Sequence, residues 1–210
     1  PWFGGHPSDP QAPSHGLVRT VEWSVAAVEL LDDGRARAEL TITASHFRVD
    51  YQVTVGSKLE LGMTVTNAGD EPASYEQALH TYLAVGDVRQ IRVKGLEGAT
   101  YIDKVDAFNR KTQPNAPIEF TGEVDSVYLD TDAPVRVEDP LLGRTILIRK
   151  TGSRSTVVWN PWVDKSKRMP DFGDDEWPGM VCVETANVAD DSMTLDPGAS
   201  AAMSVSYEIE

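Results

Sequence analysis

The sequence predicts an all-β protein, and three observations support this class. Most of the chain consists of short runs in which apolar and polar residues alternate, which is the pattern of a half-buried strand. Turn-forming glycine, proline, asparagine and aspartate separate these runs at the spacing expected of a sandwich or barrel. No stretch shows a convincing 3.6-residue apolar period. A chain of 210 residues can bury a sizeable core, so we expect one domain over residues 1–210.

In the first third of the chain, alternating runs separated by turn residues predict β-hairpins. Residues 1–16 are rich in Pro, Gly, Ser and His and favour an irregular loop. Asp33-Gly34 is a hairpin signal, so the run after it is expected to pair back on the strand before it. Strands are expected at residues 17–25, 27–31, 35–48, 51–55 and 59–66.

The run over residues 75–85 places one histidine inside an apolar strand. Alternation puts His80 and Tyr82 on one face, and neither face is polar enough to be bulk-solvated. A strand covered on both faces is a core strand. A histidine there either has a hydrogen-bond partner or lines a cleft, so a structural role and a functional role both stay open.

The rest of the chain predicts further short strands and one long loop. The loop, residues 160–179, is polar and aromatic, and loops of this length are usually functional or mobile. Strands are expected at residues 91–93, 119–121, 126–129, 135–137, 145–149, 156–159, 180–184 and 201–209.

Charge and cysteine content limit the partners. With 33 Asp+Glu against 19 Lys+Arg and a net charge of −14, the surface should repel a phosphate backbone, although a few local arginines can still bind a small anion. The single Cys182 excludes an intrachain disulfide and suits a reducing compartment. No apolar run approaches the ~20 residues of a membrane span, and no signal-peptide pattern is present. We expect a cytoplasmic monomer without nucleic-acid or membrane partners.

Several chemistries lack their motifs. There is no glycine-rich phosphate loop and no G-x-S-x-G element. The four histidines lack ligand spacing, and one cysteine cannot build a structural zinc site, so we expect no metal and no cofactor. Acid and base chemistry by carboxylates and imidazole remains.

Glu184 is the candidate carboxylate for such chemistry. In the run MVCVET, Cys182 and Glu184 point to the same side of an apolar strand. Burial would raise the pKa of the carboxyl from about 4.3 towards neutrality, which suits a general base. An exposed glutamate where the strand emerges is the alternative.

Other candidates could bind a ligand. Asp125 in GEVDSVYLD poses the same choice as Glu184, with Glu123 beside it on the same face. Arg19 lies near a loop–strand junction, where a guanidinium could hold a carboxylate or phosphate, or simply face solvent. Aromatic rings near the loops could stack on sugars, although core packing explains Trp159 equally well. This aromatic set comprises Trp2, Phe3, Trp159, Trp162 and Trp177.

Four segments, in this order, resemble the glucose-6-phosphate 1-epimerases, or hexose-6-phosphate mutarotases, of the aldose 1-epimerase superfamily. They are PWFG with HGLVRTVEW, then ALHTYLAVGDVRQIRVKGLEGATYIDK, then GEVDSVYL, and finally VVWNPWVDKSKRMPDFGDDEW with MVCVETANV. The resemblance covers nearly the whole chain. It implies a galactose-mutarotase-like β-supersandwich and a cofactor-free interconversion of the α and β anomers of glucose 6-phosphate or a related hexose 6-phosphate.

The resemblance also assigns roles. His80 of HTY matches the catalytic histidine and Glu184 of CVE the catalytic glutamate, with Glu184 as base at the C1 hydroxyl and His80 as acid at the ring oxygen. A non-catalytic carbohydrate-binding sandwich is the alternative, because the same cleft without the correct His–Glu geometry would bind sugar and not convert it.

Four further residues are implied in substrate binding. Asp125 matches the sugar-binding aspartate, and Arg19 matches an arginine after His-Gly that helps to bind substrate. Ser14 and His15 lie in the same segment, where Ser14 replaces a glutamine common in the family. The family also has several strands before PWFG that end in a phosphate-contacting Arg-Gly-Gly segment. We therefore expect a sheet without these strands, an exposed sheet edge and a phosphate site that is half built.

Overall fold

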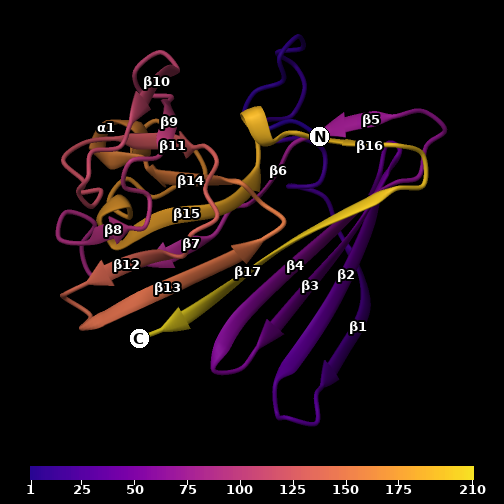
Figure 1. Ribbon diagram of the computed structural model, residues 1–210, viewed down its shortest axis with the longest axis horizontal. Coiled ribbons are helices and arrows are strands. Elements are labelled where there is room, and N and C mark those ends of the chain that lie inside the picture. Colours follow the sequence, from indigo (N-terminus) through magenta and orange to yellow (C-terminus); the bar gives the residue numbers. More distant parts are fainter. The chain divides into compact units, whose positions relative to one another are not determined.

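The computed structural model describes residues 1–210, and nearly all of its regular structure is β-strand, which confirms the predicted class (Figure 1). The chain forms two compact units. Unit 1 comprises Pro1–Ala78, Lys150–Gly152 and Asn187–Glu208, and unit 2 comprises Leu79–Arg149, Ser153–Ala186 and Ile209–Glu210. A single domain over residues 1–210 stays a prediction. None of the helices has the length and apolar character needed to cross a membrane.

Unit 1 is organised around long antiparallel strands, which are indigo to purple in Figure 1 except for the last one in the chain, which is yellow. Their order is β1 (Ser24–Leu30), β2 (Ala36–Ala44), β3 (Phe47–Val55), β4 (Lys58–Asn67) and β17 (Ser200–Ile209). The predicted turn joins β1 to β2: Gly34 has φ 84°, a left-handed conformation that glycine adopts without strain. The irregular loop predicted at residues 1–16 is confirmed, since no helix or strand precedes β1.

Strand register separates the two faces of this sheet. One transverse row is apolar and contains Leu40, Tyr51, Met63 and Met203, while the next row contains Glu39, Gln52, Gly62 and Ser204. At one end of the apolar face, Phe47, Val49 and Val65 form a buried cluster with Tyr75 and Leu195. The last two residues belong to the small sheet of β5 (Ala73–Tyr75) and β16 (Met193–Leu195). The short 3-10 helix η2 (Ala189–Asp191) precedes β16 in the chain.

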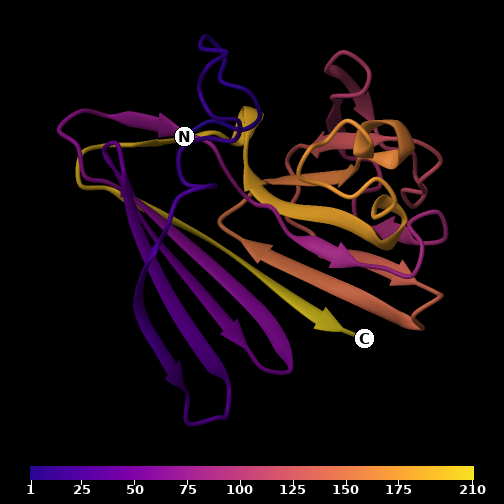
Figure 2. The same cartoon turned by 180° about the vertical axis from the view of Figure 1, so that it is seen from behind.

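Unit 2 contains two antiparallel sheets, seen from behind in Figure 2. Within this unit, the smaller comprises the strands β8 (Arg92–Lys94), β12 (Val135–Asp139) and β13 (Arg144–Thr151), which pair in this order. The larger has the order β10 (Asn109–Thr112), β9 (Thr100–Asp103), β11 (Val124–Tyr128), β14 (Ser155–Asn160) and β15 (Met180–Asn187). The strand β7 (Tyr82–Ala84) also pairs with β15, and β6 (Gln77–Leu79) crosses from unit 1 into unit 2. Every residue of β14 and β15 is buried.

Some predicted strands are wrong for local reasons. The strand predicted at residues 17–25 is wrong over most of its length, because turns occupy the segment before Ser24 and the Trp23 indole donates to the Val18 carbonyl at 3.0 Å. The strand predicted at residues 27–31 largely coincides with β1. Residues 119–121 form no strand, since pairing there stops at an isolated bridge between Val93 and Ile118. The strand β10 escaped prediction because its sequence, NRKT, is polar and largely exposed.

Candidate active site

One face of the larger sheet in unit 2 carries predicted site residues in a transverse row. The register pairs Asp125 on β11 with Trp159 on β14, Trp159 with Cys182 on β15, and Cys182 with Tyr82 on β7. Glu184 follows Cys182 by two residues, so its side chain points to the same face. Because neighbouring strands lie about 4.8 Å apart, the backbones at Asp125 and Cys182 are separated by about 10 Å, which is the scale of a hexose with its hydroxyls.

His80 reaches this face through a break in its strand. The continuous strand predicted over residues 75–85 is wrong: β6 ends at Leu79 and β7 begins at Tyr82. In the break, the Thr81 amide and hydroxyl both donate to the Leu79 carbonyl, at 2.9 and 3.3 Å, in place of ladder bonds. Such irregularities re-aim side chains next to active sites. The His80 ring stacks on Tyr82 at 4.9 Å between centroids and meets the Trp159 ring edge-on at 5.8 Å.

His80 and Glu184 form a close imidazole–carboxylate pair. The His80 Nε2 atom lies 3.5 Å from Glu184 Oε1, and the two side chains are 31% and 2% exposed. The alternative of an exposed Glu184 is therefore wrong, because β15 continues to Asn187 and the carboxyl lies within the strand. A buried carboxylate is costly without a compensating partner, and the imidazole stands where it can supply one. The pair can exchange protons with a ligand that enters from the exposed side of His80.

Cys182 lies behind the imidazole. Its Sγ atom is 3.7 Å from His80 Nδ1, within the range of a weak sulfur hydrogen bond. Burial, reinforced by the negative charge of Glu184, raises the pKa of the Cys182 thiol far above its usual range, so the thiol stays neutral. A neutral thiol can donate its hydrogen to Nδ1 of a neutral imidazole or accept the Nδ1 hydrogen of an imidazolium, so this contact is compatible with both charge states of His80.

The buried thiol predicts a pH dependence of stability. Above about pH 8.5 the unfolded chain loses the thiol proton while the folded chain keeps it, so the folded state binds more protons and the free energy of unfolding falls as pH rises. We expect a contribution of about 1.4 kcal/mol per pH unit from this group. Urea unfolding of wild type and Cys182→Ser at pH 8, 9 and 10 measures it, and equal slopes for the two proteins would contradict it.

The side chains of His80, Cys182 and Glu184 also form a group of possible metal ligands. Single donor atoms of His80, Cys182 and Glu184 lie within 4.8 Å of one another. Ligands of a tetrahedral zinc ion are about 3.3–3.6 Å apart, so a pair of donors at the 4.8 Å limit would have to approach by about an ångström. The expectation of no metal rested on sequence spacing, which cannot detect a cluster contributed by separate strands.

Two lysines that sequence reasoning missed hold Asp125. Lys104 Nζ lies 3.1 Å from Asp125 Oδ1, and Lys165 Nζ lies 3.4 Å from Oδ2 and 2.8 Å from the Glu123 carboxylate. The Asp125 side chain is only 11% exposed, so the exposed alternative is wrong. The lysines lie on other segments of the chain, and the only signal for Lys165 was its place in the long loop.

The loop over residues 160–179 is ordered by internal hydrogen bonds and by the packing of aromatic rings. The buried Asn160 amide donates to the carbonyls of Trp177 and Met180, at 2.8 and 2.9 Å, and its oxygen accepts the Trp162 amide at 2.9 Å. These bonds join the start of the short helix α1 (Trp162–Ser166) to η1 (Trp177–Gly179), and the Trp162 and Trp177 rings pack at 4.4 Å. The loop is thus anchored at both ends.

The aromatic set divides between the units. Trp159 is 7% exposed and lies beside His80, so it packs in the core and also borders the candidate site. Phe172, from the long loop, meets the same ring at 6.2 Å. Trp2 and Phe3 belong to unit 1, where Trp2 donates to the Pro13 carbonyl.

Three predicted binding residues also belong to unit 1. Arg19 is exposed in the turns before β1. The Ser14 hydroxyl donates to the Gly4 carbonyl at 3.4 Å, while the His15 amide donates to that carbonyl at 2.7 Å and its Nδ1 accepts the Gly4 amide at 3.2 Å. Ser14 and His15 therefore shape the N-terminal loop, and substrate contacts by all three stay predictions.

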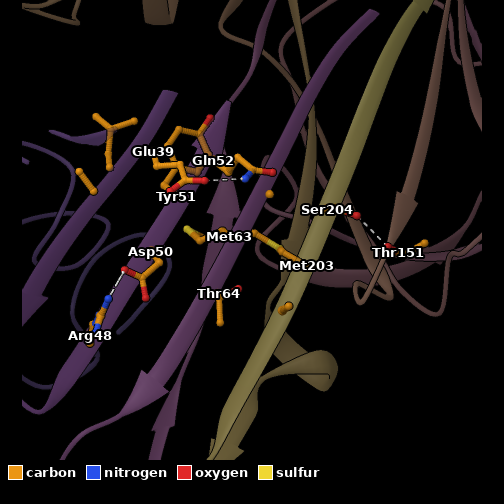
Figure 3. Close-up of a pocket in the computed structure, with 14 residues that line it drawn as sticks. Glu39, Arg48, Asp50, Tyr51, Gln52, Met63, Thr64, Thr151, Met203 and Ser204 are labelled. Carbon is orange, nitrogen blue, oxygen red and sulfur yellow. Dashed lines mark hydrogen bonds and ion pairs between the residues drawn. The ribbon is translucent and has the colours of Figure 1, made fainter. Parts of the chain in front are cut away.

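Unit 1 also has a hollow of about 490 Å³ on the polar face of its sheet (Figure 3). Its polar side chains mainly bond one another: Gln52 donates to Glu39 at 3.2 Å, and Arg48 pairs with Asp50 at 3.0 Å. None of the predicted site residues lines it, so the acid–base pair of unit 2 is the stronger candidate.

Comparison with known proteins identifies the family of this chain. The family model described as aldose 1-epimerase matches residues 1–208. A curated relative from Cenchrus ciliaris, whose name refers to a glucose-6-phosphate 1-epimerase, is 36% identical over 94% of this chain and 64% of its own length. One from Escherichia coli K12 with the same name is 32% identical over 89% of this chain and 64% of its own length. This chain thus spans just under two thirds of these relatives.

A solved structure gives the same answer for the fold. A crystal structure from Salmonella typhimurium, whose description refers to a mutarotase, aligns with a TM-score of 0.89 and 27% identity, covering 100% of this chain and 71% of its own. The predicted galactose-mutarotase-like fold is confirmed by these neighbours. The chain belongs to the aldose 1-epimerase family.

Proposed function

We propose that this protein interconverts the α and β anomers of glucose 6-phosphate or a related hexose 6-phosphate. The observation that carries the proposal is the His80–Glu184 pair, whose facing atoms are 3.5 Å apart on the sheet face that also holds Trp159 and Asp125. Family membership supports the reaction, and the names of the relatives support the phosphorylated substrate.

The reaction needs one base and one acid that exchange roles. Glu184 removes the proton of the C1 hydroxyl while His80 protonates the ring oxygen O5, so the C1–O5 bond breaks and the open-chain aldehyde forms. Rotation about C1–C2 presents the other face of the aldehyde. O5 then attacks C1, His80 takes back the O5 proton, and Glu184 returns a proton to O1. The protons balance over the cycle, and no other reagent is consumed.

The exposures of the two residues fit these roles. Glu184 is sealed within the sheet at 2% exposure, so its carboxylate meets little competition from water, while the 31% exposed His80 borders the entry side. Asp125 is assigned to bind sugar hydroxyls. Arg19, Ser14 and His15 are assigned to the substrate-binding segment, with Arg19 holding the phosphate.

Polarimetry of freshly dissolved α-glucose 6-phosphate tests the function directly. We expect the protein to accelerate the approach to anomeric equilibrium above the rate in matched buffer, and to act less on plain glucose. Binding of sugar phosphate without any catalysed rate would instead identify a non-catalytic carbohydrate-binding sandwich.

Arg19→Ala tests the phosphate assignment. We expect KM for glucose 6-phosphate to rise tenfold or more, because a charge-assisted hydrogen bond contributes about 1.5–3 kcal/mol, while activity on glucose barely changes. Arg48→Ala removes another exposed arginine of unit 1, one that is paired with Asp50, and serves as the matched control. An equal loss on both sugars would assign Arg19 a structural role.

The expected monomer, the cytoplasmic location and the absence of nucleic-acid partners stay predictions from composition.

A further inference from the structure

We propose that Lys165 is a substrate-binding residue that donates a hydrogen bond to a sugar hydroxyl at the end of the site away from C1, and that Lys104 positions Asp125 as the neighbouring acceptor. The inference rests on the proposed function, and it names the part of the chain that distinguishes one hexose phosphate from another.

The charges around Asp125 favour this arrangement. Each carboxylate oxygen faces a different ammonium, Lys104 at 3.1 Å and Lys165 at 3.4 Å. Two ammonium groups at this range compensate the burial of the carboxylate and fix its plane. A carboxylate oriented in this way is a strong acceptor for a hydroxyl hydrogen. Lys165 donates to Glu123 and Asp125, and an ammonium has three hydrogens, so one remains to meet a hydroxyl oxygen.

The direction of Lys165 fits a bound sugar. Its Nζ atom lies 6.0 Å from the centroid of the Trp159 ring, and the His80 ring lies 5.8 Å from the same centroid. The acid–base pair and the lysine therefore border one aromatic ring, while the backbones of Asp125 and Cys182 are about 10 Å apart. A hexose with C1 at His80 and Glu184 extends its distal hydroxyls towards Lys165.

The loop holds Lys165 in place before a ligand arrives. The residue next to it, Ser166, is fully buried and donates its hydroxyl to the carbonyls of Val163 and Asp174, at 2.9 and 3.1 Å. At the start of α1, Trp162 has φ 57°, a costly conformation for a bulky residue that persists because Asn160 binds its amide. Fixing a flexible lysine in advance lowers the entropy cost of binding.

The purely structural alternative is that Lys165 only neutralises Glu123 and Asp125. It is tested with Lys165→Met and Lys165→Arg, assayed on glucose 6-phosphate and on its 2-deoxy, 3-deoxy and 4-deoxy analogues. We expect Lys165→Met to raise KM for glucose 6-phosphate by about tenfold or more with kcat within about threefold, since a charged hydrogen bond is lost on binding. Lys165→Arg keeps the charge and should recover most of the loss.

The deoxy series separates hydroxyl binding from structure. If Lys165 donates to one hydroxyl, the analogue lacking that hydroxyl should show little further loss in Lys165→Met, whereas the other analogues should show the full effect. An equal effect on all four sugars, or no effect on any, would overturn the proposal. Lys111→Met is the matched control: Lys111 pairs with Asp103 and Asp106, and Asp103 is aligned with Ser126, which points to the opposite face of the sheet from Asp125.

Lys104 acts through Asp125, so a double-mutant cycle tests it. Lys104→Met should raise KM in the wild-type background and have little effect in Asp125→Asn, because the residue it positions has already lost its charge. Equal effects in both backgrounds would overturn this role. Melting temperatures of all variants identify any that are unfolded, and Lys104→Arg then replaces Lys104→Met.

Failure of this inference is distinguishable from failure of the proposed function. If wild type shows no catalysed anomerisation, the function fails, and calorimetric titration with glucose 6-phosphate still compares wild type with Lys165→Met. Weaker binding by the variant supports the inference, and equal binding overturns it.

Discussion

Glu184→Gln is expected to lower kcat by about 10²–10⁴ while KM stays within a few-fold of the wild-type value. The amide keeps the shape of the carboxyl and can still form hydrogen bonds, so binding should survive. It cannot take the proton of the C1 hydroxyl. Because Glu184 is 2% exposed, water has little access to replace the missing base. Anomerisation followed by polarimetry under saturating glucose 6-phosphate measures the loss.

A control at a different carboxylate shows whether the loss is specific. Glu119 also belongs to unit 2, but its side chain is 60% exposed and pairs with Arg92. Glu119→Gln should leave kcat unchanged within about twofold, as is usual for exposed positions. If Glu184→Gln retained most of the wild-type kcat, the assignment of the base would be wrong.

His80→Asn is expected to lower kcat to a similar extent, since the acid at O5 is removed and the ring's stacking on Tyr82 is lost with it. The double variant with Glu184→Gln should be little slower than either single variant, because groups that act in one proton relay are not additive. Losses that multiply in the double variant would show that the two residues act independently.

The pH profile gives a second measure of this pair. In the proposed cycle, kcat/KM falls at low pH when Glu184 is protonated and at high pH when His80 has lost its proton, so the wild-type profile is bell-shaped. The acidic limb should be absent from the residual activity of Glu184→Gln, and the alkaline limb should be absent from that of His80→Asn.

The alternation of side chains within single strands was enough to predict part of this site, whereas the order of the strands in the sheet was not predicted. Alternation within MVCVET was enough to place Cys182 and Glu184 on one face, and the register confirms it. Alternation also paired His80 with Tyr82, although it did so through a continuous strand that does not exist. The break depends on hydrogen bonds of Thr81 with the Leu79 carbonyl, which threonine forms in some contexts and not in others.

The lysines around Asp125 could not be found in this way. Lys104 follows β9, whose neighbour β11 is known only from the sheet order, and Lys165 lies on a five-residue helix too short to produce an apolar period. Both contacts are products of tertiary structure. A surface lysine and a binding lysine look alike in a sequence, because the difference lies in what each one faces.

The buried Asn160 has a consequence for how this scaffold can diversify. One amide closes both ends of the segment between β14 and η1 through three backbone contacts, so the residues between the ends contribute little to holding β14 and β15 together. Residues 163–175 could be exchanged between relatives while Asn160, Trp162 and Trp177 are retained. Such an exchange would replace the contacts of Lys165 with Asp125 and of Phe172 with Trp159 together, as one segment. Sugar preference could then evolve or be engineered by loop replacement while the proton-transfer residues and their sheet stay untouched.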